Sequence, residues 1–357
     1  MKKGFWKIVV ILLSLLIILV LGTLNKMRAE ENLVPLEGQQ LEDEYGEGFD
    51  ENSDTVTISK ERLLELVNES GSLWELAQRF FDDIILYKNE IGRFDYIPVN
   101  KDLAQSDYNW DCLEQLLKSH KEFEYRVGGQ TVSIKGIDVS SYQSDIDWKK
   151  VADDGVKFAF IRLGYRGYES GELTLDNRFE DNIVGALSNG IRVGVYFVTQ
   201  AVSVEEAREE AQFVLDAIAP YNVTWPVVLD LESTSGAHPR TEDLLPSQRT
   251  NYVIEFCKAV EKKGYTTMLY SNIGWFINQL ELERLDEYDK WFAQYFNRPF
   301  FPYEFQVWQY TSSGSVAGIK GNVDLNIAMY DYDAGEYVPY KQSLETDAEQ
   351  STEQRSE

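Results

Sequence analysis

From Gly136 onward, short apolar runs alternate with longer stretches in which apolar residues recur at helical spacing. This alternation is typical of parallel βα units, in which a helix follows each strand and returns the chain to the same edge of the sheet. The apolar runs predict eight strands, at residues 137–139, 158–163, 192–198, 227–232, 266–270, 291–294, 305–310 and 323–326.

Helices are predicted between the first five strands, beginning near Trp148, Asp176, Ser203 and Thr250. Ser203 and Glu206 have the capping-box pattern that often starts a helix. After the fifth strand the helical stretches shorten, and loops join most of the remaining strands. The predicted fold class is therefore α/β: a TIM-like, irregular (β/α) barrel of eight strands with incomplete helices.

An open doubly wound sheet is the alternative to a closed barrel. The nucleotide-binding form of such a sheet needs a glycine-rich turn after its first strand. Residues 138–143 occupy that position here and contain no glycine, which favours the barrel.

The chain before the barrel has a different pattern. Residues 55–134 predict a small accessory domain of unknown role that is mainly helical, because its first half shows helical spacing. A second helix is predicted near residues 110–119. Gly128 and Gly129 fit the primed turn of a two-residue hairpin.

Lysines precede an apolar run of about 17 residues, from Ile8 to Leu24, near the N-terminus. This length is short for a membrane-spanning helix and long for the core of a signal peptide. No convincing small-residue cleavage site follows, so residues 1–29 are predicted to form an uncleaved signal anchor with its basic end in the cytoplasm. Cleavage and secretion are the alternative, and in both cases the bulk of the chain is exported.

The chain of 357 residues is strongly acidic, with a formal net charge of −26 and a pI near 4.5. It therefore lacks the basic face that nucleic-acid binding requires. Much of the negative charge lies in residues 30–54 and 341–357, which cannot bury enough apolar surface to fold. These segments are predicted to be a disordered spacer and a disordered tail, and residues 135–340 are predicted to form the barrel.

The chain has two cysteines, Cys112 and Cys257, and two histidines, His120 and His238. The cysteines are far apart and are expected to be free thiols, with a single disulfide as the alternative. No cysteine or histidine spacing suggests zinc, and no cofactor is expected. Two histidines leave little room for nucleophilic catalysis that depends on histidine.

Four acids lie where a barrel places its site. The fourth predicted strand ends in Asp230 and Glu232, whose spacing puts both side chains on one face. Asp138 on the first strand and Asp324 on the last become neighbours when the barrel closes, at the strand ends where such barrels carry their sites. Glycosidic bond hydrolysis needs two nearby carboxyl groups with separated pKa values. Acids that simply reach solvent are the alternative interpretation.

Aromatic residues also gather at the predicted mouth. They lie on strands three, five, six and seven or just after them: Tyr196, Phe197, Tyr270, Trp291, Tyr295, Trp308 and Tyr310. Aromatic rings stack on the apolar faces of sugars, and their polar tips hydrogen-bond hydroxyl groups. Gln309 offers a donor and an acceptor for an acetamido or hydroxyl group. Ordinary core packing is the alternative for these rings.

These residues resemble glycoside hydrolase family 25, the lysozyme-type muramidases of bacteria and phages, over about residues 135–332. The first matching block is Gly136-Ile137-Asp138-Val139-Ser140-Ser141-Tyr142-Gln143 with Ile146-Asp147-Trp148. The later blocks are Phe158-Ala159-Phe160-Ile161-Arg162, Gly194-Val195-Tyr196-Phe197, Val228-Leu229-Asp230-Leu231-Glu232, Tyr270-Ser271-Asn272, Trp308-Gln309-Tyr310 and Asn322-Val323-Asp324-Leu325-Asn326.

The resemblance implies an incomplete eight-stranded barrel that cleaves the β-1,4 bond between N-acetylmuramic acid and N-acetylglucosamine in peptidoglycan. It implies that Glu232 is the general acid/base and that Asp230 stabilises charge at the anomeric centre or positions the acetamido group. Asp138 and Asp324 match the family's supporting acids. Many members carry a histidine where this chain has Phe197, a difference that alters contacts but removes no acid.

A proton donor near neutral pH needs a raised pKa, which partial burial and nearby acids would give Glu232, while Asp230 would stay ionised. The predicted substrate-binding residues are Tyr196, Tyr270, Gln309, Trp308, Trp291 and Arg162.

The expected partners are peptidoglycan glycan strands and, through the N-terminal segment, the bacterial cell membrane, with the bulk of the chain outside and the protein acting as a monomer. Two alternatives for the function stay open. One is a catalytically weak or inactive wall-binding or assembly module on the same barrel. The other is hydrolysis of another β-linked N-acetyl sugar polymer, such as chitin.

Overall fold

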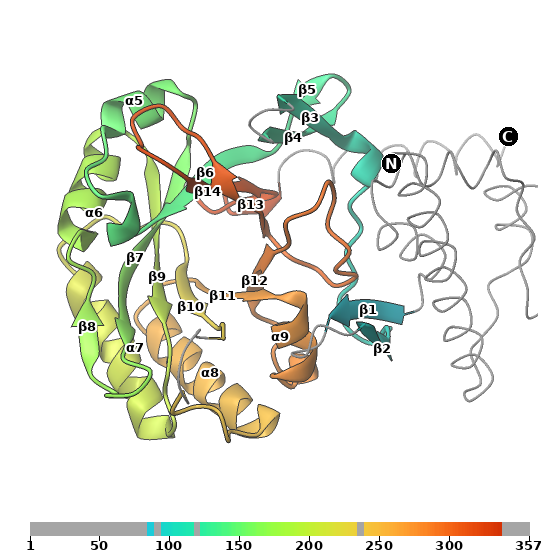
Figure 1. The fold of residues 1–357 in the computed structure, drawn as a ribbon, viewed down its shortest axis with the longest axis vertical. Helices are drawn as coiled ribbons and strands as arrows, with labels where there is room; N and C mark the ends of the chain where they lie inside the picture. Colours follow the sequence, from blue (N-terminus) through green and yellow to red (C-terminus); the bar gives the residue numbers. More distant parts are fainter. Residues whose placement is uncertain (1–83, 89–93, 118–121, 234–238, 338–357) are drawn as a thin grey trace, which may run out of the picture. The chain divides into compact units, whose positions relative to one another are not determined.

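Eight strands close into a barrel at the positions that the sequence predicts (Figure 1). They are β6 (Ile134–Val139), β7 (Phe158–Arg166), β9 (Arg192–Val198), β10 (Val227–Asp230), β11 (Thr267–Asn272), β12 (Asp289–Ala293), β13 (Val307–Gly314) and β14 (Val323–Ala328). Their order around the barrel is β6-β7-β9-β10-β11-β12-β13-β14, and β6 pairs with both β7 and β14 to close the ring. The closed barrel is therefore confirmed over the open sheet.

The last strand runs against its neighbours. β14 pairs antiparallel with both β13 and β6, whereas the strands from β6 to β13 are parallel around the ring. Only residues 315–322 join β13 to β14, and a parallel connection needs a crossover of a dozen or more residues. The start of β14 therefore lies at the end of the barrel where the parallel strands finish.

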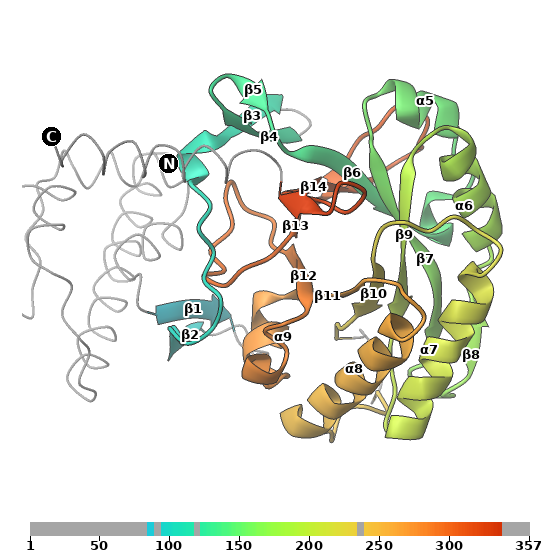
Figure 2. The same cartoon turned by 180° about the vertical axis from the view of Figure 1, so that it is seen from behind.

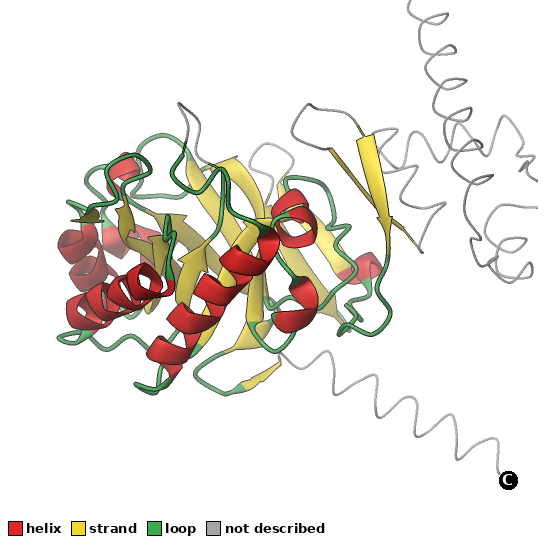
Figure 3. Cartoon of the chain, turned by 90° about the horizontal axis from the view of Figure 1, so that it is seen from below, coloured by secondary structure: helices red, strands yellow, loops and turns green. Residues whose placement is uncertain are grey.

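Helices cover part of the barrel's outer face, as Figure 3 shows. They are α5 (Trp148–Asp153), α6 (Phe179–Ser188), α7 (Val204–Ile218), α8 (Pro246–Glu261) and α9 (Ile273–Asn278). α6 packs on β7 and β9, α8 packs on β10 and β11, and α7 lies beside α8 (Figure 2). The Ser203 side chain accepts a hydrogen bond from the Glu206 amide at 3.2 Å, which confirms the predicted start of α7. A short extra strand, β8 (Leu173–Leu175), pairs with the end of β7.

The barrel interior and its outer face form separate apolar layers. The interior layer consists of Phe158, Phe160, Trp225, Val228, Met268, Trp291, Val307 and Ala328. Alternation along β7 sends Phe158 and Phe160 inward and Ala159 and Ile161 outward, as the period of a strand requires. A Cβ atom on Gly194 would lie 2.5 Å from the Phe160 ring, so glycine is needed there to admit the large inward side chain.

The segment before the barrel forms strands. It contains a hairpin of β1 (Ile84–Lys88) and β2 (Phe94–Pro98), and a three-stranded sheet of β3 (Leu113–Leu117), β4 (Glu122–Val127) and β5 (Gln130–Thr131). The helix predicted near residues 110–119 is wrong. One 3-10 turn, η1 (Trp110–Cys112), leads into β3, whose Leu113 and Gln115 pair with Tyr125 and Phe123 of β4.

In residues 113–117, pairing with β4 therefore overrides the helical spacing of the apolar residues. The Gly-Gly hairpin between β4 and β5 is confirmed. Gly128 and Gly129 have φ angles of 58° and 80°, as a primed turn requires.

The described residues between 84 and 133, which we call the N-terminal extension, pack on barrel strands whose outer face no helix covers. The Tyr108 hydroxyl donates to the Phe305 carbonyl at 2.6 Å, and the Trp110 ring stacks on the Phe305 ring with centroids 6.0 Å apart. Phe123 contacts Trp308 and Tyr310 at ring distances of 5.6 and 5.2 Å. The extension therefore covers the part of the barrel that the short connections leave without helices.

Both cysteines are free thiols, as predicted. Cys257 is fully buried on α8, where burial raises the pKa of its thiol. Cys112 is half-buried in η1, so the alternative of a disulfide between them is not formed.

The computed structural model describes residues 84–88, 94–117, 122–233 and 239–337, all within one compact unit that begins at Asp83. The predicted anchor (1–29), the acidic spacer (30–54), the first helix of the accessory domain and the tail (341–357) lie outside the described residues and stay predictions. The division of the chain into domains also stays a prediction. Across the ranges given above, no helix has both the length and the hydropathy needed to cross a membrane.

Candidate active site

The structure brings the four predicted acids together at one end of the barrel. Asp138 on β6 and Asp324 on β14 are direct partners in the ladder that closes the ring. Asp230 is the last residue of β10, and Glu232 follows two residues later. Asp138 and Asp230 are buried, Asp324 is half-buried, and Glu232 is exposed. Glu232 is therefore the most accessible of the four acids.

Asp138 is held by two amide side chains. The Gln309 and Asn326 amide nitrogens both donate to Asp138 Oδ2 at 2.8 Å. The Trp291 indole N–H donates to Asn326 Oδ1 at 2.8 Å, which fixes the orientation of the Asn326 amide. Asn326 was not predicted as a site residue, although its place two residues after Asp324 puts it on the same strand face.

Gln309 has an internal role, and its predicted contact with substrate stays a prediction. Its amide nitrogen is used by Asp138, and its amide oxygen accepts from the hydroxyls of Tyr270 and Tyr295, each at 2.9 Å. The side chain is also buried. Gln309 thus links two tyrosines of the mouth to the buried acid.

The acids raise one another's pKa values. Burial is the largest cause that raises the pKa of Asp138 and Asp230 well above the ordinary range, and the charge of Glu232 adds to both shifts. Burial, together with the charge of Glu232, raises the pKa of Asp324 to about 6. Desolvation raises the pKa of Glu232 as well, and Arg162 opposes that shift. Burial and mutual repulsion therefore favour the protonated forms of these acids.

Burial acts against the prediction that Asp230 stays ionised. Asp230 Oδ1 is buried and has no hydrogen-bond partner among the described residues. Without a donor to stabilise its charged form, burial dominates and raises the pKa of Asp230. Only Arg162 acts in the opposite direction on the pKa of this carboxyl.

The backbone on both sides of Glu232 is anchored. The Leu231 amide donates to the Tyr270 carbonyl at 3.0 Å, and the Ser271 hydroxyl donates to the Leu231 carbonyl at 2.5 Å. On the other side, the Trp275 indole N–H donates to Ser233 Oγ at 2.9 Å. These anchors were not predicted, because they come from β11 and α9, which are distant in sequence from Glu232.

Arg162 projects from β7 next to the acids. Its Nε donates to Asp176 Oδ2 at 2.7 Å, and its Nη2 donates to Ser141 Oγ at 2.9 Å. Arg162 pairs in the ladder with Tyr196 on β9, which in turn pairs with Val228 on β10, and its charge lowers the pKa of both Asp230 and Glu232. The structure therefore places this predicted substrate-binding residue at the mouth.

The aromatic predictions divide according to strand alternation. Tyr196 and Tyr270 are half-buried, and both rings contact Trp291, with centroids 6.0 and 4.4 Å away. Trp291 itself lies inside the barrel beneath the acids and is only 1% exposed. The placement of Trp308 at the mouth is wrong. It is fully buried on the outer face of β13, and its indole N–H donates to the Gln294 carbonyl at 2.9 Å.

Phe197 and Tyr310 are also buried on the outer face, so their predicted place at the mouth is wrong for the same reason. Side chains alternate along a strand, and these residues occupy positions that point away from the barrel axis. Phe197 packs on Phe213 of α7, and Tyr310 packs on Phe123 of the extension.

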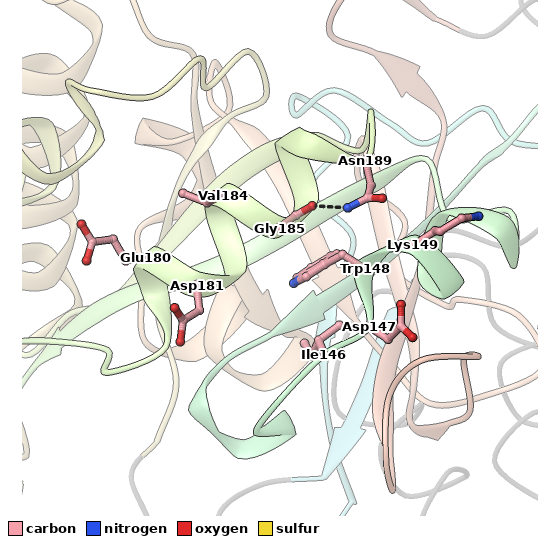
Figure 4. Close-up of a pocket in the computed structure, with 9 residues that line it drawn as sticks. All are labelled: Ile146, Asp147, Trp148, Lys149, Glu180, Asp181, Val184, Gly185 and Asn189. Atoms are coloured by element: carbon pink, nitrogen blue, oxygen red, sulfur yellow. Dashed lines mark hydrogen bonds between the residues drawn. The ribbon is translucent and has the colours of Figure 1, made fainter.

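A separate cavity of about 600 Å³ lies between α5 and α6 (Figure 4). Its lining includes Trp148, Val184 and Gly185, and the Asn189 amide donates to the Gly185 carbonyl at 2.9 Å. None of the four acids lines this cavity; its charged lining residues are Asp147, Lys149, Glu180 and Asp181. The chemistry of the site therefore belongs to the mouth of the barrel.

Comparison with known proteins agrees with this geometry. Residues 137–319 match the family described as glycosyl hydrolases family 25. The uncharacterized protein YegX of Escherichia coli K12 is 31% identical over 218 residues, which are 58% of this chain and 73% of YegX. The autolytic lysozyme of Clostridium acetobutylicum is 26% identical over 194 residues, which are 54% of this chain and 55% of that enzyme. The chain thus spans about half the length of the clostridial lysozyme.

A solved structure shows the same fold. The family 25 glycosyl hydrolase from Bacillus anthracis superposes with a TM-score of 0.50 at 23% identity, covering 61% of this chain and 96% of that one. At this identity the likeness concerns the fold alone.

Proposed function

Because the chain belongs to glycosyl hydrolase family 25 and is therefore a glycoside hydrolase, we propose that it is a peptidoglycan hydrolase that cleaves the β-1,4 bond between N-acetylmuramic acid and N-acetylglucosamine. The observation that supports this most is the convergence of four carboxyl groups at one barrel mouth, with one exposed and two buried. Its similarity to a clostridial protein named autolytic lysozyme supports the choice of substrate.

Glu232 is the proton donor in this proposal. It is the exposed acid of the four, so it can reach a glycosidic oxygen, and desolvation raises its pKa, which favours the protonated form that a general acid needs. Its anchored backbone limits the positions that the carboxyl can take.

Asp230 is the second carboxyl that takes part in the reaction in this proposal. Its unpartnered Oδ1 can accept a hydrogen bond from the N–H of a substrate acetamido group, which would satisfy the buried carboxylate. That hydrogen bond, and positive charge that develops at the anomeric carbon, would both favour the ionised form of Asp230, which in turn stabilises that charge. Asp138 and Asp324 complete the cluster of four acids, and hydrogen bonds from Gln309 and Asn326 hold the Asp138 side chain in place.

The reaction is tested by the new ends that it creates. The purified chain is incubated with peptidoglycan, and the products are reduced with borohydride and hydrolysed. Reduced muramic acid is the expected new end. Reduced glucosamine instead would identify a glucosaminidase, and turnover of chitin without turnover of peptidoglycan would identify another polymer as the substrate. Tight wall binding by a chain that releases no ends would indicate a binding module.

Replacing Trp275 with Phe is expected to lower kcat about three- to tenfold, the effect of losing one hydrogen bond that positions Glu232. The Phe ring preserves stacking on the Arg249 guanidinium, which lies 5.3 Å from the Trp275 ring. Ser233→Ala should have the same effect, and the double variant should be no worse than either single one. Effects that multiply in the double variant would show that the two residues act separately.

Stability should fall as the pH rises through the range where Asp324 loses its proton. The pKa of Asp324 is about 6 in the folded protein and 3.8 ordinarily, so between these values the folded state binds more protons than the unfolded state. Asp324→Asn removes this penalty. It should raise the melting temperature at pH 7.5 by about 2–6 °C and change it little at pH 4, corresponding to about 1–2 kcal/mol after solvent screening.

Thermal denaturation at the two pH values measures this difference. Asp153→Asn is the control, since Asp153 is an exposed acid on α5 that pairs with Lys149. A rise of the same size at both pH values would mean that Asn packs better than Asp, without any contribution from titration.

A further inference from the structure

The exposed aromatic side chains of the described residues all lie near the mouth. They are Tyr142, Tyr165, Tyr168 and Tyr295, with 83%, 38%, 40% and 49% of their surface exposed. Tyr142 follows β6, Tyr165 and Tyr168 lie at and just after the end of β7, and Tyr295 follows β12. Each position is therefore at the carboxyl end of a parallel barrel strand. Because they gather at one end of the barrel, these rings offer aromatic surface that a ligand at the mouth can contact.

Two of these tyrosines enclose Arg162. The guanidinium carbon lies 5.1 Å from the centre of the Tyr142 ring and 5.9 Å from the centre of the Tyr165 ring. We call Tyr142, Arg162 and Tyr165 the tyrosine ledge. The ledge combines two aromatic faces with a planar donor group between them, which suits a sugar ring with apolar C–H faces and polar edges.

Hydrogen bonds hold the η2 backbone and the Arg162 side chain of the ledge. Tyr142 lies in the 3-10 turn η2 (Ser141–Gln143), where its amide donates to Ser140 Oγ at 3.2 Å and the Ser140 amide donates to the Gln143 side chain at 2.9 Å. The buried Asp176 carboxylate accepts from both the Ser141 amide and the Arg162 side chain. A ledge fixed in this way loses little conformational freedom on binding.

The ledge lies beside the four acids. Asp138 pairs with Phe160 in the β6–β7 ladder, two residues before Arg162 on the same strand, and Tyr142 follows Asp138 by four residues. β6 and β7, which lead to the ledge, are adjacent in the ring, whereas β12, which precedes Tyr295, is separated from β7 by β9, β10 and β11. Exposed tyrosines thus lie on two sides of the mouth.

We propose that the tyrosine ledge is a glycan subsite that binds sugar units of the same strand away from the cleaved bond, so that long strands are preferred over short fragments. This proposal rests on the proposed function. The ledge suits neutral sugar units better than anionic stem peptides, because the charge of Arg162 is already paired with Asp176 at 2.7 Å. Little net positive charge remains to attract a peptide carboxylate.

Binding is measured without turnover. The full chain carrying Glu232→Gln is titrated with long glycan strands whose stem peptides have been removed. Adding Tyr142→Ala or Tyr165→Ala should raise Kd about tenfold, the effect of losing one aromatic contact. Adding Tyr142→Phe keeps the ring and should restore Kd to within about twofold of the parent. Leu116→Ala, an exposed apolar residue on β3, is the control away from the mouth.

An unchanged Kd in both alanine variants would overturn the proposal. So would a loss seen only with strands that keep their peptides, since the ledge would then bind the stem. In the chain with native Glu232, kcat/KM of Tyr142→Ala should fall about tenfold further for long strands than for a tetrasaccharide. An equal loss on both substrates would mean that Tyr142 supports the acids and not a distant subsite. A chain that binds strands through the ledge but hydrolyses nothing would contradict the proposed function alone.

Discussion

Glu232→Gln is expected to lower the rate of peptidoglycan cleavage by about 10²–10⁴-fold, the usual effect of removing a general acid. The substitution keeps the shape of the side chain and removes the proton that the leaving oxygen needs. Because Glu232 is exposed and its charge raises the pKa of three neighbouring acids, the variant should fold as well as the native chain. Release of reducing ends from purified sacculi measures the loss.

Glu255→Gln is the matched control. Glu255 is an acid on α8 that pairs with Arg208 at 2.6 Å and lies outside the mouth, so its loss should leave the rate unchanged. A Glu232→Gln chain that retains most of its activity would contradict the assignment. Asp324, which is half-buried and has a pKa of about 6, would then be the acid to test as the donor.

The strands of the barrel could be predicted because each is an apolar run bounded by polar residues. The direction of β14 was not predicted, although the short connection of residues 315–322 contains the reason. That reversal places Asp324 near the start of its strand and still at the mouth, beside Asp138. The acids were therefore predicted from strand ends and strand order, without knowledge of the strand direction.

The aromatic residues could not be assigned to faces in the same way. Strands β12 and β13 are apolar on both faces, so the sequence does not show which side chains point inward. Trp291 lies inside the barrel and Trp308 lies outside it, and both are buried. The exposed rings, such as Tyr142 and Tyr165, follow or end strands and do not stand out in the apolar pattern. A binding surface that is built from strand ends and loops can therefore be recognised only from the structure.

The N-terminal extension shows a second limit of the sequence pattern. Residues 113–117 have a composition compatible with a helix, yet they form a strand that pairs with β4. β4 is itself held in place because its Phe123 packs on barrel residues Trp308 and Tyr310. Contacts between residues far apart in sequence decide the structure here. The same contacts make the extension part of the fold of the barrel.

Phe123→Ala is expected to lower the free energy of unfolding by about 3–5 kcal/mol, the range for removing a buried aromatic ring. Phe123 is 6% exposed and contacts Trp308 and Tyr310 on the outer face of β13. Denaturant titration measures the loss, and the melting temperature should fall by about 2–4 °C for each kcal/mol. Leu116→Ala in the same small sheet is the control, because Leu116 is 41% exposed and should contribute little.

Removing all residues before Ile134 should have a larger effect, since it uncovers Phe305, Trp308 and Tyr310 together. An apolar patch of this kind on a barrel strand promotes association and precipitation, so the shortened chain should aggregate when it is expressed alone. Addition of Trp308→Gln would not rescue it, because Phe305 would still be uncovered. A monomeric barrel that melts within a few degrees of the full chain would show instead that the extension is a separate module, as residues 55–134 were predicted to be.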